Sequence, residues 1–155
     1  MTRVLGIDPG THRLGWAVIG GTKSKPHLLA CDVLEFPQHT SSAEYLQKIH
    51  SFIDSLLLKY HPDKLGIEAL FAQKNVKTAI QVAEARGVIL FTFAARGYVW
   101  HELSPNTVKS AVAGAGNAGK AEVRRMVGLL LNLDTAQLLD DTTDALAVAL
   151  AAQIL

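Results

Sequence analysis

The sequence predicts a single α/β domain in which helices flank a mixed five-stranded sheet. Three observations lead to this prediction. Three strand-like segments with short connections open the chain, which is typical of an antiparallel meander. Two further short apolar segments each follow a helical pattern, which is typical of parallel crossovers. The 155 residues are 49% hydrophobic, so we expect one ordered domain, residues 1–155, with its own core.

The first three strands are expected at residues 3–8, 14–19 and 27–36. The first is apolar and stops at the turn signal Asp8-Pro9-Gly10, and the second stops at Gly20-Gly21. The third shows the alternating pattern of a strand. Their short connections make them antiparallel neighbours.

The middle of the chain predicts two units of a helix followed by a strand. A capping box over residues 41–44 begins an amphipathic helix that ends near Pro62, and a strand follows at 64–68. A long helix is expected at 75–96 and the fifth strand at 98–103.

Helices dominate the last third of the chain. Ser104-Pro105 combines an N-cap with a proline at the first helical position, which begins a helix that ends at about residue 113. Residues 114–119 are expected to form a flexible loop, and residues 120–131 a further helix. Asp140 and Asp141 begin the last helix, where acidic side chains favour the N-terminal end.

The long helix leaves two interpretations open. Its first half is poor in large side chains, which permits the close approach of another element. Either it packs tightly on its own sheet, or it forms a subunit interface. The small residues are Ala79, Ala83, Ala85 and Gly87.

Charge and composition exclude several classes of protein. The formal net charge is only +1, but residues 74–125 carry eight basic and three acidic side chains, whereas residues 126–155 carry four aspartates and no base. The single cysteine, Cys31, cannot form a disulfide within the chain and fits a reducing compartment. The longest apolar stretch, residues 145–152, is too short to cross a bilayer. We therefore expect a cytoplasmic protein without a membrane segment or a structural zinc site.

Four carboxylates stand at positions where chemistry is expected. Asp8 and Glu68 each end an otherwise apolar strand, although Asp8 alone would also suit a turn. Asp144 shares one face of the last helix with Asp141 and also with Asp140, and an N-cap role does not explain Asp144. If the two strands are neighbours, these side chains can meet in one site.

A divalent cation would relieve the repulsion between four such carboxylates. Their hard oxygen ligands suit Mg²⁺ or Mn²⁺, and two such ions can clamp the attacking and leaving oxygens of a phosphodiester. Beside a basic segment that can hold a phosphate backbone, this pattern is typical of a metal-dependent nuclease.

The motifs resemble those of the RuvC family of bacterial crossover-junction endodeoxyribonucleases. The similarity runs from residue 3 to about residue 152, with the motifs in the family's order. They are Gly6-Ile7-Asp8-Pro9-Gly10-Thr11, Gly15-Trp16-Ala17-Val18, residues 67–75, Ala85-Arg86-Gly87-Val88, Ser104-Pro105 with Val108-Lys109, Gly119-Lys120 with Val123 and Met126-Val127, and residues 141–147.

This resemblance implies a ribonuclease-H-like fold and a homodimer that cuts two opposed strands of a Holliday junction. The cut ends would be 5′-phosphates and 3′-hydroxyls that a ligase can seal. It also implies a branch-migration motor as a partner, and the helix with Ala85-Arg86-Gly87 as the dimer contact. The expected functions are homologous recombination and DNA repair.

The resemblance also assigns roles to individual residues. Two metal ions, Mg²⁺ or Mn²⁺, are expected on four catalytic carboxylates, with basic residues near the scissile phosphates and an aromatic side chain stacked on bases near the crossover. The carboxylates are Asp8, Glu68, Asp141 and Asp144; the basic residues are Lys109 and the catalytic Lys120; the aromatic residue is Phe71, with Lys74 and Asn75 expected to contact DNA beside it. Asp140 departs from the family pattern, so the choice of Asp141 as ligand depends on the Asp-x-x-Asp spacing.

Other interpretations are weaker. Residues 114–121 nearly spell a P-loop, but Ala121 replaces the Ser or Thr that holds magnesium. The segment 6–11 is also similar to the first phosphate loop of actin-like kinases, which need two lobes. A binding-only module for branched nucleic acid has no use for carboxylates beside phosphates. A related nuclease that acts on RNA, or on junctions without dimer symmetry, stays an alternative.

Overall fold

The computed structural model describes residues 1–70 and 75–155, and in these residues five strands form one sheet in the order β3-β2-β1-β4-β5. β1 is antiparallel to β2, β2 is antiparallel to β3, and β4 and β5 continue the sheet in parallel from β1. The predicted mixed sheet is therefore confirmed. The strands are β1 Val4–Asp8, β2 Arg13–Thr22, β3 Lys25–Glu35, β4 Lys64–Glu68 and β5 His101–Leu103.

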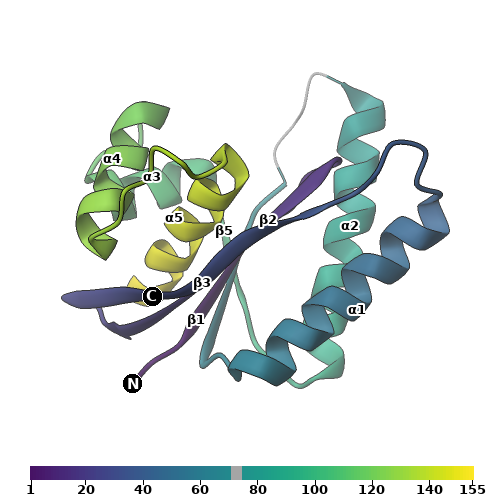
Figure 1. Cartoon of the computed structure of the whole chain (residues 1–155), viewed down its shortest axis with the longest axis horizontal. Coiled ribbons are helices and arrows are strands. Elements are labelled where there is room, and N and C mark those ends of the chain that lie inside the picture. Colours follow the sequence, from purple (N-terminus) through teal and green to yellow (C-terminus); the bar gives the residue numbers. More distant parts are fainter. Residues whose placement is uncertain (71–74) are drawn as a thin grey trace.

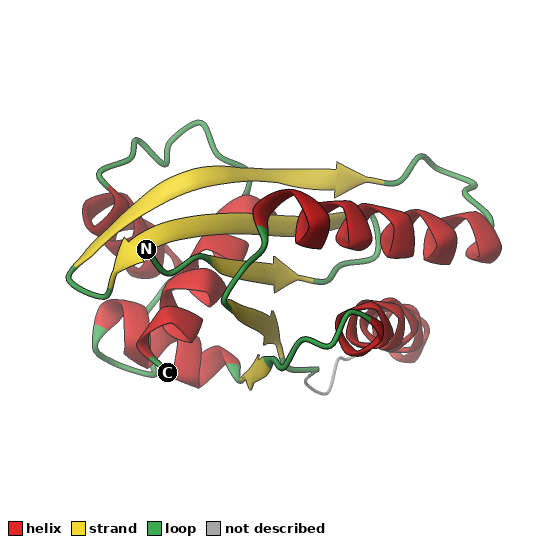
Figure 2. Cartoon of the chain, turned by 90° about the horizontal axis from the view of Figure 1, so that it is seen from below, coloured by secondary structure: helices red, strands yellow, loops and turns green. Residues whose placement is uncertain are grey.

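The described helices cover both faces of this sheet. α1 and α2 lie on one face, and α3, α4 and α5 lie on the other (Figure 1). Seen from below, the strands shorten from the β3 edge towards β5 (Figure 2). The helices are α1 Ser42–Tyr60, α2 Val76–Ala95, α3 Pro105–Ala113, α4 Lys120–Leu131 and α5 Asp140–Ile154.

Period-two alternation along the strands divides the interior into two cores. In β1, Leu5 and Ile7 are buried with α1 and α2, whereas Val4 belongs to the core under α5. In β4, Leu65 and Ile67 also face α1 and α2. Because successive side chains point to opposite faces, the residue after each isoleucine points towards the α5 side.

Small residues allow α5 to lie close to the sheet. A Cβ at Gly6 would overlap the backbone of Ala145 and Ala149, and one at Gly15 would overlap the carbonyl oxygen of Asp141. A Cβ at Gly66 would lie 2.7 Å from the Ala152 methyl group. The sheet therefore seats α5 at a distance that only glycine permits at these positions.

Local capping signals place the helices where the sequence predicts them. Ser41 and Glu44 form the predicted capping box of α1, and Ser104 accepts a hydrogen bond from the Thr107 backbone N–H ahead of Pro105. Asn75 and Arg96 flank α2 as its caps, within the predicted helix limits.

The third strand begins at Lys25, two residues before its predicted start, and the second and fifth strands differ more from the prediction. The fifth strand begins at His101 and not at residue 98, because the Tyr98 N–H donates back to the carbonyl oxygen of Phe93 at the end of α2. The second strand runs on through Gly20 and Gly21 to Thr22, where the chain stays paired with β3 beyond an irregularity at Val18/Ile19. Gly20 and Gly21 interrupt the apolar side-chain pattern of the strand, but their backbones remain paired with β3.

By length and composition, α2 is the one described helix long and apolar enough to cross a membrane. Polar residues interrupt its apolar ones, so it does not stand out as an uninterrupted apolar run in the sequence. One such helix is weak evidence for a membrane-spanning segment, because helices of soluble proteins can have the same length and composition. Here Ala85, Ile89 and Phe93 are buried against the sheet and α1.

Candidate active site

The parallel pairing of β1 and β4 brings two strand-end carboxylates together. Ile7 lies opposite Ile67 in register, so Asp8 and Glu68 follow at the same edge of the sheet. Both isoleucines face α1 and α2, so both carboxylates point to the opposite face, where α5 lies. The sequence predicted this meeting on the condition that the two strands are neighbours.

The start of α5 supplies the remaining two carboxylates. Asp8 is paired with Gly15 across β1 and β2, and Gly15 is the residue that lies under the backbone of Asp141. Asp144 follows one turn later on the same helix face. The close seating of α5 therefore brings Asp141 and Asp144 towards the end of β1.

The electrostatics of the site show that these groups interact. Burial raises the pKa of Asp8 well above its ordinary value; a hydrogen bond and charge from Glu68, and the charges of Asp144 and Asp141, raise it further. Burial also raises the pKa of Asp144, which the Lys120 ammonium opposes and the charge of Glu68 reinforces. Asp8 and Asp144 therefore resist ionisation beside other carboxylates, and such an arrangement favours a bound cation.

Lys120 lies among the aspartates of α5. Its Nζ is 3.2 Å from Asp140 Oδ2 and 3.7 Å from Asp144 Oδ2. Partial burial lowers the pKa of Lys120, but Asp144 and Asp140 outweigh that effect and leave it raised. Lys120 is therefore a cation at the edge of the carboxylate cluster.

Asp140 is turned towards basic side chains on α4. Besides Lys120, it accepts from Arg124 NH1 at 2.9 Å. Arg124 also donates to the carbonyl oxygens of Thr135 and Leu138, which fixes the segment before α5. Hydrogen bonding to Lys120 lowers the pKa of Asp140, in contrast to that of Asp144.

A cavity of about 230 Å³ connects the acidic and basic residues. Glu68 and Asp144 line it together with Lys109 and Lys120. Lys109 comes from α3 and Lys120 from the first turn of α4. Both predicted lysines therefore lie on the same cavity as two of the predicted carboxylates.

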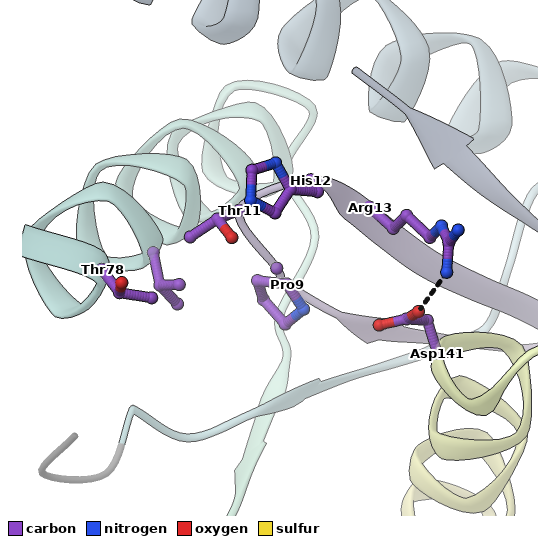
Figure 3. A pocket seen from close by; sticks show the side chains of 8 residues that line it. Pro9, Thr11, His12, Arg13, Thr78 and Asp141 are labelled. Carbon is purple, nitrogen blue, oxygen red and sulfur yellow. Dashed lines mark ion pairs between the residues drawn. The ribbon is translucent and has the colours of Figure 1, made fainter. Parts of the chain in front are cut away.

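A larger cavity of about 610 Å³ lies on the other side of Asp141, between the β1–β2 turn and the start of α2 (Figure 3). Thr11, His12 and Thr78 line it, and Arg13 NH1 lies 3.9 Å from Asp141 Oδ2. Arg13 also pairs with Glu35 at 3.1 Å. No motif in the sequence predicts that Arg13 contacts Asp141. The only signal is a basic residue at the start of a strand, two residues before Gly15, which lies under the Asp141 backbone.

Within residues 1–70 and 75–155, no three acidic, histidine or cysteine side chains stand already arranged as a metal cage. Two basic side chains lie beside the aspartates of α5: Lys120 pairs with Asp144 and Arg13 with Asp141. The donor set itself, carboxylate oxygens on both sides of a buried Asp8, has the chemistry that a hard divalent cation requires.

The other predicted DNA contacts are placed only in part. Phe71 and Lys74 lie outside the described residues. The Asn75 side chain accepts from the backbone N–H groups of Lys77 and Thr78 and thereby caps α2. The side-chain oxygen of Asn75, which was predicted to contact DNA, is therefore already engaged in a hydrogen-bonded helix cap.

The fold and the arrangement of this edge place the chain in the class of ribonuclease-H-like α/β proteins. A solved structure of the yeast mitochondrial Holliday junction resolvase shares the fold, with a TM-score of 0.73 at 15% identity over 98% of this chain and 79% of that one. The solved structure of T. thermophilus RuvC in complex with Holliday junction substrate matches more closely, with a TM-score of 0.91 at 32% identity over 97% of this chain and 92% of that one.

Sequence comparison narrows the class to one family. The family model described as crossover junction endodeoxyribonuclease RuvC matches residues 4–152. The protein of that name from Roseiflexus sp. is 44% identical over 96% of this chain and 89% of its own length, and that from Heliobacterium modesticaldum is 42% identical over 95% and 91%. The chain belongs to the RuvC family, and the predicted resemblance is confirmed.

Proposed function

We propose that this chain is an endonuclease that resolves Holliday junctions by paired, symmetric cuts in two opposed strands. The observation that carries the proposal is the buried Asp8, whose pKa is raised by its burial and by Glu68, Asp144 and Asp141, next to a cavity that two lysines line. Such a site is suited to phosphodiester hydrolysis in a family whose members are named crossover junction endodeoxyribonucleases. The cuts would leave 5′-phosphate and 3′-hydroxyl ends for ligation in recombination and repair.

The four carboxylates would hold Mg²⁺ or Mn²⁺, with two ions per site. Bound there, the cations would supply charge for the scissile phosphate and lower the pKa of an attacking water. Asp8 lies between Glu68 and the two aspartates of α5, so it would contribute to both ions, Glu68 to one, and Asp141 with Asp144 to the other. Positive charge bound there would favour the ionised form of Asp8, whose pKa is raised by its burial and its acidic neighbours.

The lysines would act on the DNA itself. Lys120 is 64% exposed in its side chain and lies at the rim of the cavity, so it can leave its aspartate partners for a phosphate oxygen. Lys109 would bind the backbone beside it. Phe71, Lys74 and Asn75 follow the acidic strand end in sequence, and we assign base stacking to Phe71 on the family resemblance.

The outer face of α2 would form the homodimer. Val76, Ile80 and Phe91 are 71%, 55% and 65% exposed, and they lie on one stripe with the exposed Ala83 and Gly87. Two sites related by a twofold axis match two opposed strands of a junction. A branch-migration motor is the partner that the family resemblance implies. Because the proposed substrate is DNA, the protein would act in the cytoplasm.

The test is a cleavage assay on a mobile four-way junction labelled on each strand in turn. With Mg²⁺ or Mn²⁺ we expect nicks at symmetric positions on two opposed strands, sealed by ligase. Asp8→Asn should bind the junction and leave it uncut. If the wild type binds the junction without cutting it, the binding-only alternative is favoured. Cuts in RNA, or cuts that are not paired, would favour the related nuclease. Cutting by Asp8→Asn would overturn the assignment of the site.

A further inference from the structure

Arg86 on α2 contacts the strand end that carries Glu68. Its side chain is only 12% exposed. The Nε atom donates to the backbone carbonyl oxygen of Glu68 at 3.2 Å, and NH2 donates to Glu102 Oε2 at 2.7 Å. One guanidinium thus links α2 with the ends of β4 and β5.

The contact falls at the end of β4, where Glu68 is still paired with Leu103 of β5 but no longer with β1. The β1–β4 pairing ends at Ile67, one residue before Glu68. On the β5 side, the Ala69 N–H donates to the carbonyl oxygen of Leu103 at 2.8 Å. The Glu68 carbonyl oxygen accepts the hydrogen bond from Arg86 at this strand end. Arg86 therefore fixes the peptide plane from which the Glu68 side chain projects.

Glu102 holds the other end of the guanidinium. It lies opposite Ile67 in register, on the sheet face that α2 covers, whereas the Glu68 carboxylate projects to the α5 face. The Trp100 indole N–H donates to Glu102 Oε1 at 3.3 Å. With both oxygens engaged, the Glu102 carboxylate is oriented towards Arg86, and a planar donor fork suits this geometry better than an ammonium group does.

The same helix carries the exposed stripe assigned to the dimer. Ala85 is buried on the sheet, Gly87 is exposed with no atom within 4 Å of the place that a Cβ would occupy, and Arg86 lies between them. A shift of α2 would therefore be transmitted to the Glu68 backbone through Arg86.

We propose that Arg86 is a positioning residue that sets the orientation of Glu68 for divalent-cation binding and couples it to α2. This proposal rests on the proposed function, because it takes Glu68 as a metal ligand. Partners that orient ligating groups are typically worth about 10- to 100-fold in metal affinity or activity. Arg86→Lys keeps the charge and removes the fork, so it tests geometry without removing a cation.

The experiment measures Mn²⁺ affinity of the DNA-free protein by calorimetry for wild type, Arg86→Lys and Glu102→Gln. The matched control is Arg96→Lys, because Arg96 lies at the end of the same helix and pairs through both nitrogens with Asp54 on α1, at 2.6 and 2.7 Å. We expect Arg86→Lys to weaken Mn²⁺ binding about 10-fold, Glu102→Gln to weaken it less, and Arg96→Lys to leave it unchanged.

Junction cleavage against metal concentration gives the second measurement. Arg86→Lys should need about 10-fold more metal for half-maximal cutting, while junction affinity without metal stays at the wild-type value. An unchanged Mn²⁺ affinity in Arg86→Lys, or an equal loss in Arg96→Lys, would overturn the proposal. Because the calorimetry needs no DNA, it decides this role even if the wild type fails to cut junctions, a result that would count against the proposed function alone.

Discussion

At the residue scale, protonation of the Asp8 carboxyl group links the stability of the fold to the candidate metal site. A raised pKa means that the folded protein binds this proton more tightly than the unfolded chain does. The resulting stability is fully present below the ordinary value of 3.8 and is lost as the pH rises through the folded-state pKa. Without metal, Asp8 therefore contributes less to stability at neutral pH than it does at low pH.

Asp8→Asn should accordingly be more stable than the wild type at pH 7 in EDTA, by about 0.5–2 kcal/mol. The difference should shrink towards pH 4, where Asp8 is protonated. Urea unfolding across this pH range measures it. Saturating Mg²⁺ should raise the stability of the wild type and not that of the variant, and an Asp8→Asn variant less stable than wild type at pH 7 in EDTA would contradict the role given to Asp8.

The neighbouring aspartates Asp140 and Asp141 should differ in function. Asp140 pairs with Lys120 and Arg124 on an exposed surface, where ion pairs contribute little, so Asp140→Asn should cut within about fivefold of wild type. Asp141→Asn removes a proposed metal ligand, so its cutting rate should fall at least about 100-fold. Single-turnover cleavage distinguishes them; a larger loss in Asp140→Asn would show that Asp140 is the ligand.

At the element scale, the position of α5 depends on the glycines beneath it. Gly15→Ala would place a methyl group against the Asp141 carbonyl and lift the start of the helix. We expect a stability loss of about 1–3 kcal/mol from overpacking and a rate loss of about 100-fold, because a shift of about 1 Å at a site has that effect.

Thermal unfolding and single-turnover cutting measure both effects. A Gly15→Ala variant with wild-type stability and cutting would show that α5 does not owe its position to Gly15.

The elements differ in how far sequence could predict them. The capping box at Ser41, the proline start of α3 and the strand-end carboxylates are local signals, and the structure follows them. The hold of Arg86 on Glu68 depends on a contact between α2 and β4, and the shortened β5 depends on where one backbone N–H of Tyr98 bonds. Neither leaves a periodic or spacing pattern in the chain.

At the scale of the whole molecule, the exposed apolar stripe on α2 predicts a dimer. Ile80→Glu should shift the protein to monomer, measured by analytical ultracentrifugation, and should lose paired cutting. Val99→Glu is the matched control, because Val99 is an 84% exposed apolar residue outside α2 and should stay dimeric. A dimer that survives Ile80→Glu would show that the subunits meet elsewhere.

Anomalous diffraction from crystals soaked in Mn²⁺ tests the shared metal site without relying on activity. We expect manganese peaks within about 2–2.5 Å of carboxylate oxygens from Asp8 and from both Glu68 and the Asp141–Asp144 pair, with loss of these peaks in Asp8→Asn. Manganese bound away from these four residues, or unchanged in that variant, would show that the carboxylates do not form the metal site.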